Sequence, residues 1–125
     1  ILREIHLELH RAAVGSYTEL RLRRAISYIH DNPTRHIDVD ELLLKSGMGK
    51  SAFFQAFRQL TGTSPARYAD RVRLEHARDL LLGTDWSVEQ VAARCGYEDP
   101  FYFSRCFRKE FGLSPRKYRQ ENPAE

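Results

Sequence analysis

The stretch DPFYFSRCFRKEFG, residues 99–112, is the starting point for the fold that we expect for the whole chain. Asp99 followed by Pro100 is typical of a helix start, because the carboxylate can accept the free N–H groups of the first turn and proline has no N–H to leave unpaired. Gly112 is typical of a helix end, since glycine adopts the left-handed conformation without a Cβ penalty. The stretch therefore predicts one helix with both ends marked.

The two faces of this predicted helix differ in chemistry. One face is apolar and requires a core, and it carries Phe103, Cys106, Phe107 and Phe111. The opposite face carries an aromatic ring, a hydroxyl and two guanidinium groups, on Phe101, Ser104, Arg105 and Arg108. These are groups that contact base edges and phosphates in DNA. An arginine-bearing helix face is by default only a solvated surface, so this helix alone is weak evidence for DNA binding.

The same pattern occurs twice in the chain. Shifted by fifty residues, GKSAFFQAFRQLTGTSPARY (49–68) aligns with DPFYFSRCFRKEFGLSPRKY (99–118). The residues that coincide are Phe53, Phe57, Arg58, Gly62, Ser64, Pro65 and Tyr68, each with the same residue type fifty positions later. Upstream the alignment continues at a shift of forty-nine, which places Gly47 over Gly96. A duplicated helix-turn-helix unit is the simplest explanation.

Composition fits a soluble globular protein with one domain or two very small ones. The chain has 125 residues, of which 42% are hydrophobic and 30% charged, and no apolar run is long enough to cross a membrane. The net charge of +3 is compatible with a polyanionic partner without establishing one. We find no signal-peptide layout and expect a cytoplasmic protein. Ile1 is not a native initiator, so we expect the true N-terminus to lie upstream.

The cysteines and histidines indicate packing and solvation, and we expect neither a metal site nor a cofactor. Cys95 and Cys106 lie among apolar neighbours, which is typical of reduced, buried thiols. His6 and His10 are spaced so that one helix could present both imidazoles to a metal. Glu8 lies between them and not beside His6, so the zinc-hydrolase motif is absent. An amphipathic helix belonging to an upstream domain explains residues 1–14 better.

Capping signals divide the rest of the chain. Asp38 with Glu41, and Ser87 with Gln90, form capping boxes that open a short helix in each copy, and Gly47 and Gly96 end those helices. The second helix of the first copy is expected at about 50–60, and that of the second at about 100–111. We predict these divisions: 1–15, the end of an upstream effector domain or a linker; 16–64, a first helix-turn-helix subdomain; 65–83, a linker helix; 84–119, a second subdomain; and 120–125, a tail.

The predicted linker helix begins after Ser64 and stops at Gly83. Its apolar side carries Tyr68, Val72, Ala77, Leu80 and Leu81, and its charged residues Arg67, Arg71, Arg73, Glu75 and Arg78 are expected to face solvent. At about 1.5 Å per residue the helix spans on the order of 25 Å. A helix of that length can hold two DNA-reading helices apart by something near one duplex turn, roughly 34 Å.

Two segments carry a resemblance to a known family. GTSPARYADRVRLEHARDLL (62–81) and VAARCGYEDPFYFSRCFRKEFGLSPRKYR (91–119) resemble the DNA-binding domain of the AraC/XylS family of bacterial transcription regulators, over about residues 22–119. The resemblance implies an all-α fold of about seven helices, with both recognition helices in successive major-groove segments of double-stranded DNA. It also implies RNA polymerase as a partner and an effector-binding domain upstream, whose end the segment ILREIHLEL (1–9) resembles.

Carried over by position, the resemblance implies a set of DNA-contacting residues. The base-reading positions are Ser51, Phe54 and Gln55 in the first unit, and Pro100, Phe101, Ser104 and Arg105 in the second. Lys50, Arg58 and Arg108 are the expected phosphate contacts. The first unit departs from the family pattern, because Gly49 stands where serine commonly caps the helix and Gln55 where arginine is common. Phe54 is unusual on a groove-facing position, and either contacts a thymine methyl group or turns inward.

Other classes of function fit the residues less well. An enzyme needs a convergent nucleophile and base or a metal cluster, and the chain has no Gly-rich phosphate loop and no zinc ligand set. The main alternative is a helical protein-interaction module, which would need apolar anchors where the predicted faces carry Arg, Gln and Ser. RNA is a poorer partner than DNA, because its deep, narrow major groove does not admit a helix.

Overall fold

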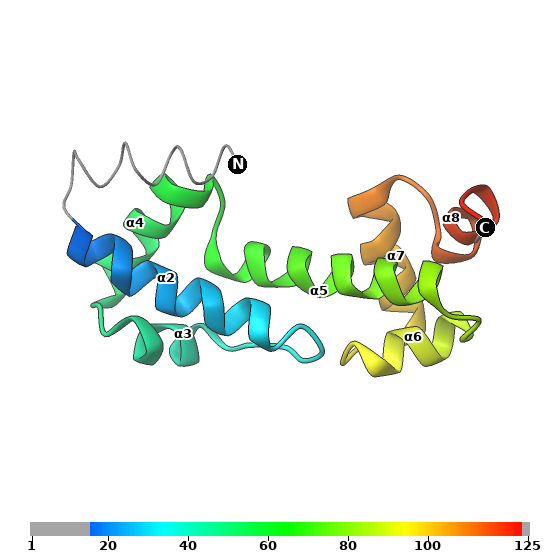
Figure 1. The fold of residues 1–125 in the computed structure, drawn as a ribbon, viewed down its shortest axis with the longest axis horizontal. Coiled ribbons are helices and arrows are strands. Elements are labelled where there is room, and N and C mark those ends of the chain that lie inside the picture. The colour runs from blue at the N-terminus through cyan, green and yellow to red at the C-terminus, as the bar shows by residue number, and fades with distance from the viewer. Residues whose placement is uncertain (1–15, 124–125) are drawn as a thin grey trace. The chain divides into compact units, whose positions relative to one another are not determined.

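The computed structural model describes residues 16–123, and over that range the chain forms helices and no strands. The seven helices are α2 (Ser16–Asp31), α3 (Val39–Ser46), α4 (Lys50–Thr61), α5 (Pro65–Gly83), α6 (Val88–Arg94), α7 (Pro100–Phe111) and α8 (Pro115–Glu121) (Figure 1). The predicted all-α class is confirmed. The helix expected over residues 1–14, with His6 and His10, lies outside the described residues.

The chain divides into two compact units, and the division falls inside α5, between Ala69 and Asp70. Unit 1 contains residues 37–69 and the segment up to Asn32, and unit 2 contains residues 33–36 and those from Asp70 onward. Each unit therefore includes one complete short helix followed by one complete recognition-helix candidate, α3 with α4 and α6 with α7.

Unit 1 is held together by the apolar side of α2, which lies against α3 and α4 (Figure 1). Leu22, Ala25 and Ile29 of α2 are buried with Leu42 of α3. From α4, Phe53 and Phe57 are fully buried, and the Phe57 ring meets the Tyr68 ring edge-on at 5.5 Å and 85°. Aliphatic side chains of α2 and α3 thus pack against the aromatic rings of α4 to form the core of unit 1.

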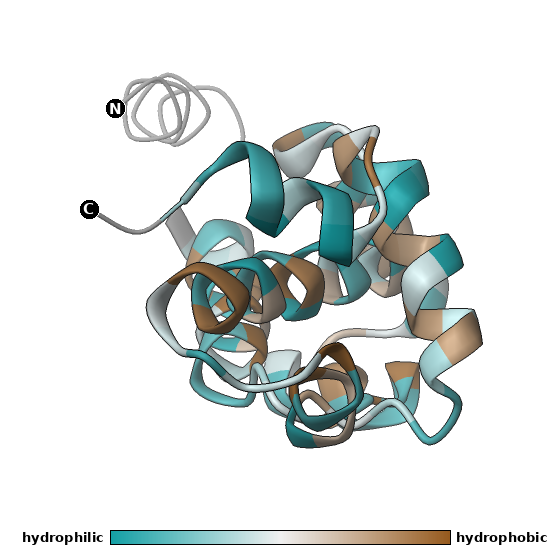
Figure 2. Ribbon diagram, turned by 90° about the vertical axis from the view of Figure 1, so that its right-hand side faces the viewer, coloured by the Kyte–Doolittle hydropathy of each residue, from teal (hydrophilic) through white to brown (hydrophobic). Residues whose placement is uncertain are grey.

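Unit 2 has a core of the same kind. Its fully buried rings are Phe103 and Phe107 of α7, surrounded by Leu81, Val91 and other apolar residues of α5 and α6. The Phe107 ring meets the Tyr118 ring edge-on at 5.5 Å and 86°, the same arrangement fifty residues later. Trp86 and Phe111 pack against this cluster and are partly buried. Figure 2 shows the consequence for the helices, which are hydrophobic on one side and hydrophilic on the other.

The helix boundaries follow from the caps that the sequence predicts. The Ser87 hydroxyl accepts a hydrogen bond from the Gln90 N–H at 3.1 Å, while the Gln90 side chain accepts one from the Ser87 N–H at 2.8 Å. Asp99 accepts from the Phe101 N–H at 2.9 Å, and Pro100 occupies the first turn of α7. The capping box at the start of α3 is also present. These helix starts are confirmed.

Left-handed glycines end the short helices and the recognition-helix candidates. Their φ angles are 69° at Gly47, 81° at Gly62, 82° at Gly96 and 85° at Gly112. α5 ends differently, because the Thr84 hydroxyl donates to the Leu80 carbonyl at 2.6 Å and accepts from the Trp86 N–H at 3.3 Å. The Thr84 side chain therefore forms the hydrogen bonds that end α5.

Two details differ from what the sequence led us to expect. Arg73, expected on the solvent-facing side of α5, is only 8% exposed, so that prediction is wrong for this residue. In addition, helix α8 continues to Glu121, past the point where we placed the tail. The Arg119 guanidinium donates to the Leu81 carbonyl at 2.9 Å, which ties α8 to the end of α5.

Candidate nucleic-acid interface

The outward face of α4 is polar and open to solvent except at one position. Ser51 and Gln55 are exposed, as are the flanking Lys50 and Arg58. Phe54 is half-buried, with its ring 6.1 Å from that of Phe53 and nearly perpendicular to it. The Phe54 ring is therefore supported by the core residue beside it and still presents part of its surface to solvent.

The outward face of α7 is richer in aromatic surface. Phe101 is 75% exposed and the neighbouring Tyr102 is 53% exposed, large fractions for apolar rings in a folded domain. Arg105 and Arg108 are exposed, while Pro100 and Ser104 are half-buried. The seven residues predicted to read bases thus lie on two solvent-facing helix surfaces, one in each unit, and none is buried.

Tyr102 is not included among the residues that the sequence analysis places on the exposed face of α7. Its ring lies under the Arg105 guanidinium, whose central carbon is 5.7 Å from the ring centroid. A hydrogen bond with the Cys106 thiol raises the pKa of the Tyr102 hydroxyl above its ordinary value. The signal was available, because residues 102 and 105 are three apart and neighbours on a helix surface.

The turn that leads into α7 is held by Arg73, the buried arginine of α5. The Arg73 guanidinium lies 4.0 Å from the centroid of the Tyr97 ring and donates to the Gly96 carbonyl at 3.3 Å. It also lies 3.9 Å from the Asp70 carboxylate. Burial raises the pKa of Tyr97 to about 12, against the opposing effect of the Arg73 charge. The turn between α6 and α7 is therefore held by a desolvated cation.

An ion pair fixes the other end of α7. The Arg71 guanidinium nitrogen lies 3.3 Å from the Glu110 carboxylate, and the Arg78 guanidinium lies 5.1 Å from the centroid of the Phe111 ring. Three arginines of α5 thus contact α7 or the turn that leads into it. The two arginines of α7 itself, Arg105 and Arg108, are exposed.

The two cysteines, Cys95 and Cys106, are free thiols in different environments. Cys95 is fully buried, and desolvation raises its pKa to about 11. Cys106 is half-buried and less enclosed than the sequence suggested. Both are free cysteines, and within residues 16–123 no cluster of three or more His, Cys, Asp or Glu side chains could hold a metal ion. No helix in that range is both long and apolar enough to cross a membrane.

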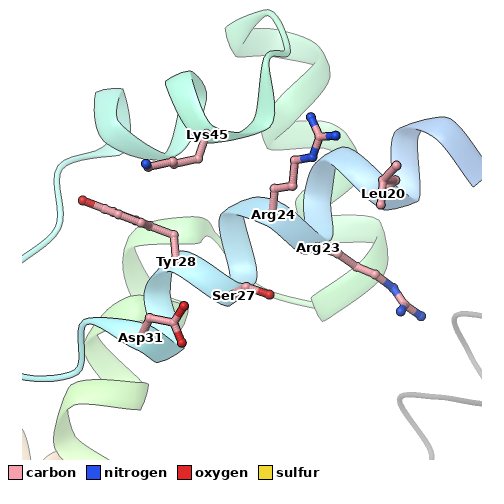
Figure 3. Close-up of a pocket in the computed structure, with 7 residues that line it drawn as sticks. All are labelled: Leu20, Arg23, Arg24, Ser27, Tyr28, Asp31 and Lys45. Carbon is pink, nitrogen blue, oxygen red and sulfur yellow. The ribbon is translucent and has the colours of Figure 1, made fainter.

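A second basic surface lies on unit 1, in a shallow groove of about 390 Å³ between α2 and α3. Figure 3 shows its lining residues: Leu20, Arg23, Arg24, Ser27, Tyr28, Asp31 and Lys45. The Tyr28 hydroxyl donates to Glu41 at 2.7 Å, and the Lys45 ammonium lies 4.8 Å from the centroid of the Tyr28 ring. No residue of α4 lines this groove, so it is separate from the predicted base-reading face.

Comparisons with known proteins agree on one class of domain. The model of a helix-turn-helix domain family matches residues 42–121. The transcriptional activator RhaS of Klebsiella pneumoniae (strain 342) is 37% identical over 113 residues, which cover 90% of this chain and 41% of RhaS. The activator RhaR of Yersinia pseudotuberculosis (serotype O:1b, strain IP 31758) is 41% identical over 85 residues, 68% of this chain and 29% of RhaR. The chain thus spans less than half the length of these relatives.

Solved structures with this fold include one bound to DNA. The DNA-binding domain of the transcription factor AdpA, in complex with a target DNA, aligns with a TM-score of 0.74 and 32% identity, over 80% of this chain and 90% of that one. An AraC-type regulator from Chromobacterium violaceum aligns with a TM-score of 0.77 and 29% identity, over 83% of this chain and 93% of that one.

Proposed function

This chain belongs to the family of AraC-type helix-turn-helix DNA-binding domains of transcription regulators, and from that premise we propose that α4 and α7 are its recognition helices. Each would occupy one of two successive major-groove segments of a double-stranded DNA site. Ser51, Phe54 and Gln55 would contact bases from α4, and Pro100, Phe101, Ser104 and Arg105 from α7.

One observation carries this proposal. α4 and α7 bury the same aromatic pair in the same way, with Phe53 and Phe57 matching Phe103 and Phe107, yet their exposed faces carry different side chains. Equivalent exposed positions carry a carboxamide on Gln55 and a guanidinium on Arg105, two groups that can pair with base edges. Glutamine pairs two-pronged with adenine, and arginine with the O6 and N7 acceptors of guanine. The domain would therefore read different bases with its two units.

Lys50, Arg58 and Arg108 are proposed phosphate contacts, because all three are exposed cations at the ends or edges of the two recognition helices. Phosphate contacts position a protein on the duplex without carrying sequence information. They also release counterions, so each contributes to the salt dependence of DNA affinity.

The proposal extends to the protein of which this domain forms a part. The curated relatives are described as transcriptional activators and are more than twice as long as the matched segment. We propose an effector-binding domain upstream, RNA polymerase as a partner and a location in the cytoplasm, where a bacterial regulator meets its DNA. We expect no catalytic activity and no cofactor requirement.

Titration of fluorescent duplex DNA at several salt concentrations tests the proposal. Affinity should fall by orders of magnitude between about 50 and 200 mM salt. A plot of log affinity against log salt has a negative slope, and Arg58→Ala and Arg108→Ala should each reduce its magnitude by about 1. Arg23→Ala, which removes an exposed cation of α2, is the matched control and should leave the slope unchanged. A weak salt dependence, with all three variants alike, would favour a protein-interaction module instead.

A further inference from the structure

Four side chains of unit 2 form a continuous series of cation–aromatic and aromatic contacts. Arg73 lies on the Tyr97 ring at 4.0 Å, the Tyr97 and Tyr102 ring centroids are 6.4 Å apart, and the Arg105 guanidinium lies 5.7 Å from the Tyr102 centroid. We call these four residues the arginine–tyrosine series. It leads from a buried cation of α5 to an exposed cation of α7.

The buried end of the series is fixed by several independent contacts. Arg73 and Tyr97 are 8% and 6% exposed. The Arg73 guanidinium donates to the carbonyl of Gly96, lies close to that of Cys95 at 3.5 Å, and faces the Asp70 carboxylate. A desolvated guanidinium with these partners cannot change rotamer without losing them. The Tyr97 ring is therefore a rigid support.

The exposed end is the part that needs support. A solvent-exposed arginine has many rotamers, and binding a base in one geometry costs the entropy of the others. The Tyr102 ring, held between Tyr97 and the Arg105 guanidinium, offers a surface on which that guanidinium can rest through a cation–π interaction.

We propose that Tyr102 is a specificity-determining positioning residue, which orients the Arg105 guanidinium toward the base that it reads while Tyr97 and Arg73 hold Tyr102 in place. This inference rests on the proposed role of Arg105 as a base reader. Tyr102 itself acts through Arg105 and needs no contact with a base.

Unit 1 has no equivalent series. Under the fifty-residue shift, Ala52 occupies the position of Tyr102 and Gln55 that of Arg105. An alanine offers no ring against which a side chain can rest, so Gln55 has to be ordered by the DNA alone. The preference of unit 2 for its base should accordingly be sharper than that of unit 1.

The test compares affinities for a panel of duplexes that differ by single base pairs within a site selected by the wild-type domain. Tyr102→Leu should reduce discrimination at the base pair that Arg105→Ala relaxes, by about twofold to fivefold, the range of an exposed cation–π contact. Tyr102→Phe keeps the ring and should retain the wild-type preference. The double variant Tyr102→Leu/Arg105→Ala should discriminate no less than Arg105→Ala alone, because Tyr102 acts only through Arg105.

The matched control is Tyr17→Leu. Tyr17 is 71% exposed and lies under the Arg21 guanidinium at 4.7 Å, but it belongs to α2 and not to a recognition helix. This variant should leave discrimination unchanged at every base pair. Thermal unfolding of each variant should show the same midpoint within a few degrees, since both tyrosines are on the surface.

Two results would overturn the inference while leaving the proposed function standing. In one, Arg105→Ala relaxes a single base pair and Tyr102→Leu leaves that preference intact. In the other, Tyr102→Leu weakens binding to every duplex equally. A different result, in which Arg105→Ala itself weakens every duplex by the same factor, would refute the base-reading role on which the inference rests.

Discussion

Units 1 and 2 are two versions of one helix-turn-helix, and they differ chiefly at their surfaces. Inside, the ring contacts of Phe57 with Tyr68 and of Phe107 with Tyr118 agree to within 1° in interplanar angle at the same 5.5 Å separation. Outside, α4 presents mainly small and amide side chains and α7 presents rings and guanidinium groups. The residues that form the core and those proposed to contact DNA are thus different residues of the same helix, so we expect that either set can change without the other.

The turns between the two helices of each unit differ as well. Gly47 and Gly96 both have left-handed backbones, but a Cβ at Gly47 would meet nothing within 4 Å. A Cβ at Gly96 would lie 2.8 Å from the Thr34 carbonyl oxygen and 3.1 Å from the Arg35 Cα. Unit 2 therefore closes its turn against another backbone segment, whereas unit 1 leaves its turn open to solvent.

The largest difference in stability between the units should appear when Gly47 and Gly96 are each replaced by alanine. Gly47→Ala should cost about 1–2 kcal/mol, the strain of a left-handed alanine. Gly96→Ala adds a clash with backbone atoms that cannot rotate away, so the cost should reach roughly 2–4 kcal/mol. Urea denaturation of both variants measures the difference. Equal losses of stability would show that the crowding at Gly96 relaxes freely.

The second difference concerns alkaline pH. Burial raises the pKa of Cys95 from 9.0 to about 11, while the equivalent residue of unit 1 is Ser46, whose buried hydroxyl donates to the Leu43 carbonyl at 2.9 Å. Because the folded thiol binds its proton more tightly than the unfolded one, its contribution is complete below pH 9 and is lost as the pH rises through about 11.

Denaturation at a series of pH values checks this. Between pH 8 and pH 11 the wild type should lose roughly 2 kcal/mol more than Cys95→Ala, which has no thiol to ionise. The variant should start lower at pH 8, because it leaves a small cavity. Parallel curves for the two proteins would contradict the assignment. Ser46→Ala is the matched control and should change stability without changing its pH dependence.

The sequence allowed much of this arrangement to be predicted. The capping boxes and the left-handed glycines each depend on residues within a few positions of one another, so local chemistry specifies them. The repeat was visible because two stretches fifty residues apart carry the same residue types. The burial of Arg73 could not be predicted in this way. An arginine on an amphipathic helix normally reaches solvent, and its partners Tyr97, Cys95 and Gly96 lie more than twenty residues further along the chain.

The candidate site shows the same division. Which positions of α4 and α7 face outward followed from helical periodicity, and exposure of Ser51, Gln55, Phe101 and Arg105 agrees with it. The state of Phe54 did not follow, because whether a ring leans on Phe53 depends on the space that packing leaves. The proposed support of Arg105 by Tyr102 also depends on Tyr97, which lies outside the helix.

The smallest expected difference in stability between the units concerns the N-terminal caps of α4 and α7. α7 begins at Asp99, whose carboxylate accepts the Phe101 N–H, and α4 begins at Gly49, which has no side chain to do so. Asp99→Ala should cost about 1 kcal/mol, and Gly49→Ser should stabilise by a few tenths of a kcal/mol because the backbone at Gly49 is already extended. Thermal denaturation measures both. Destabilisation by Gly49→Ser would show that the two helix starts are not interchangeable.

The claim that the two units read different bases is tested most directly by selecting bound sites from a pool of random duplexes with the wild-type domain, followed by Gln55→Ala and Arg105→Ala. We predict a nonpalindromic site, in which the preferred adenine and the preferred guanine are separated by one duplex turn, about 10 base pairs. Gln55→Ala should remove the preference for adenine alone, and Arg105→Ala that for guanine alone. A palindromic site, or a site in which both variants lose the same preference, would contradict the account.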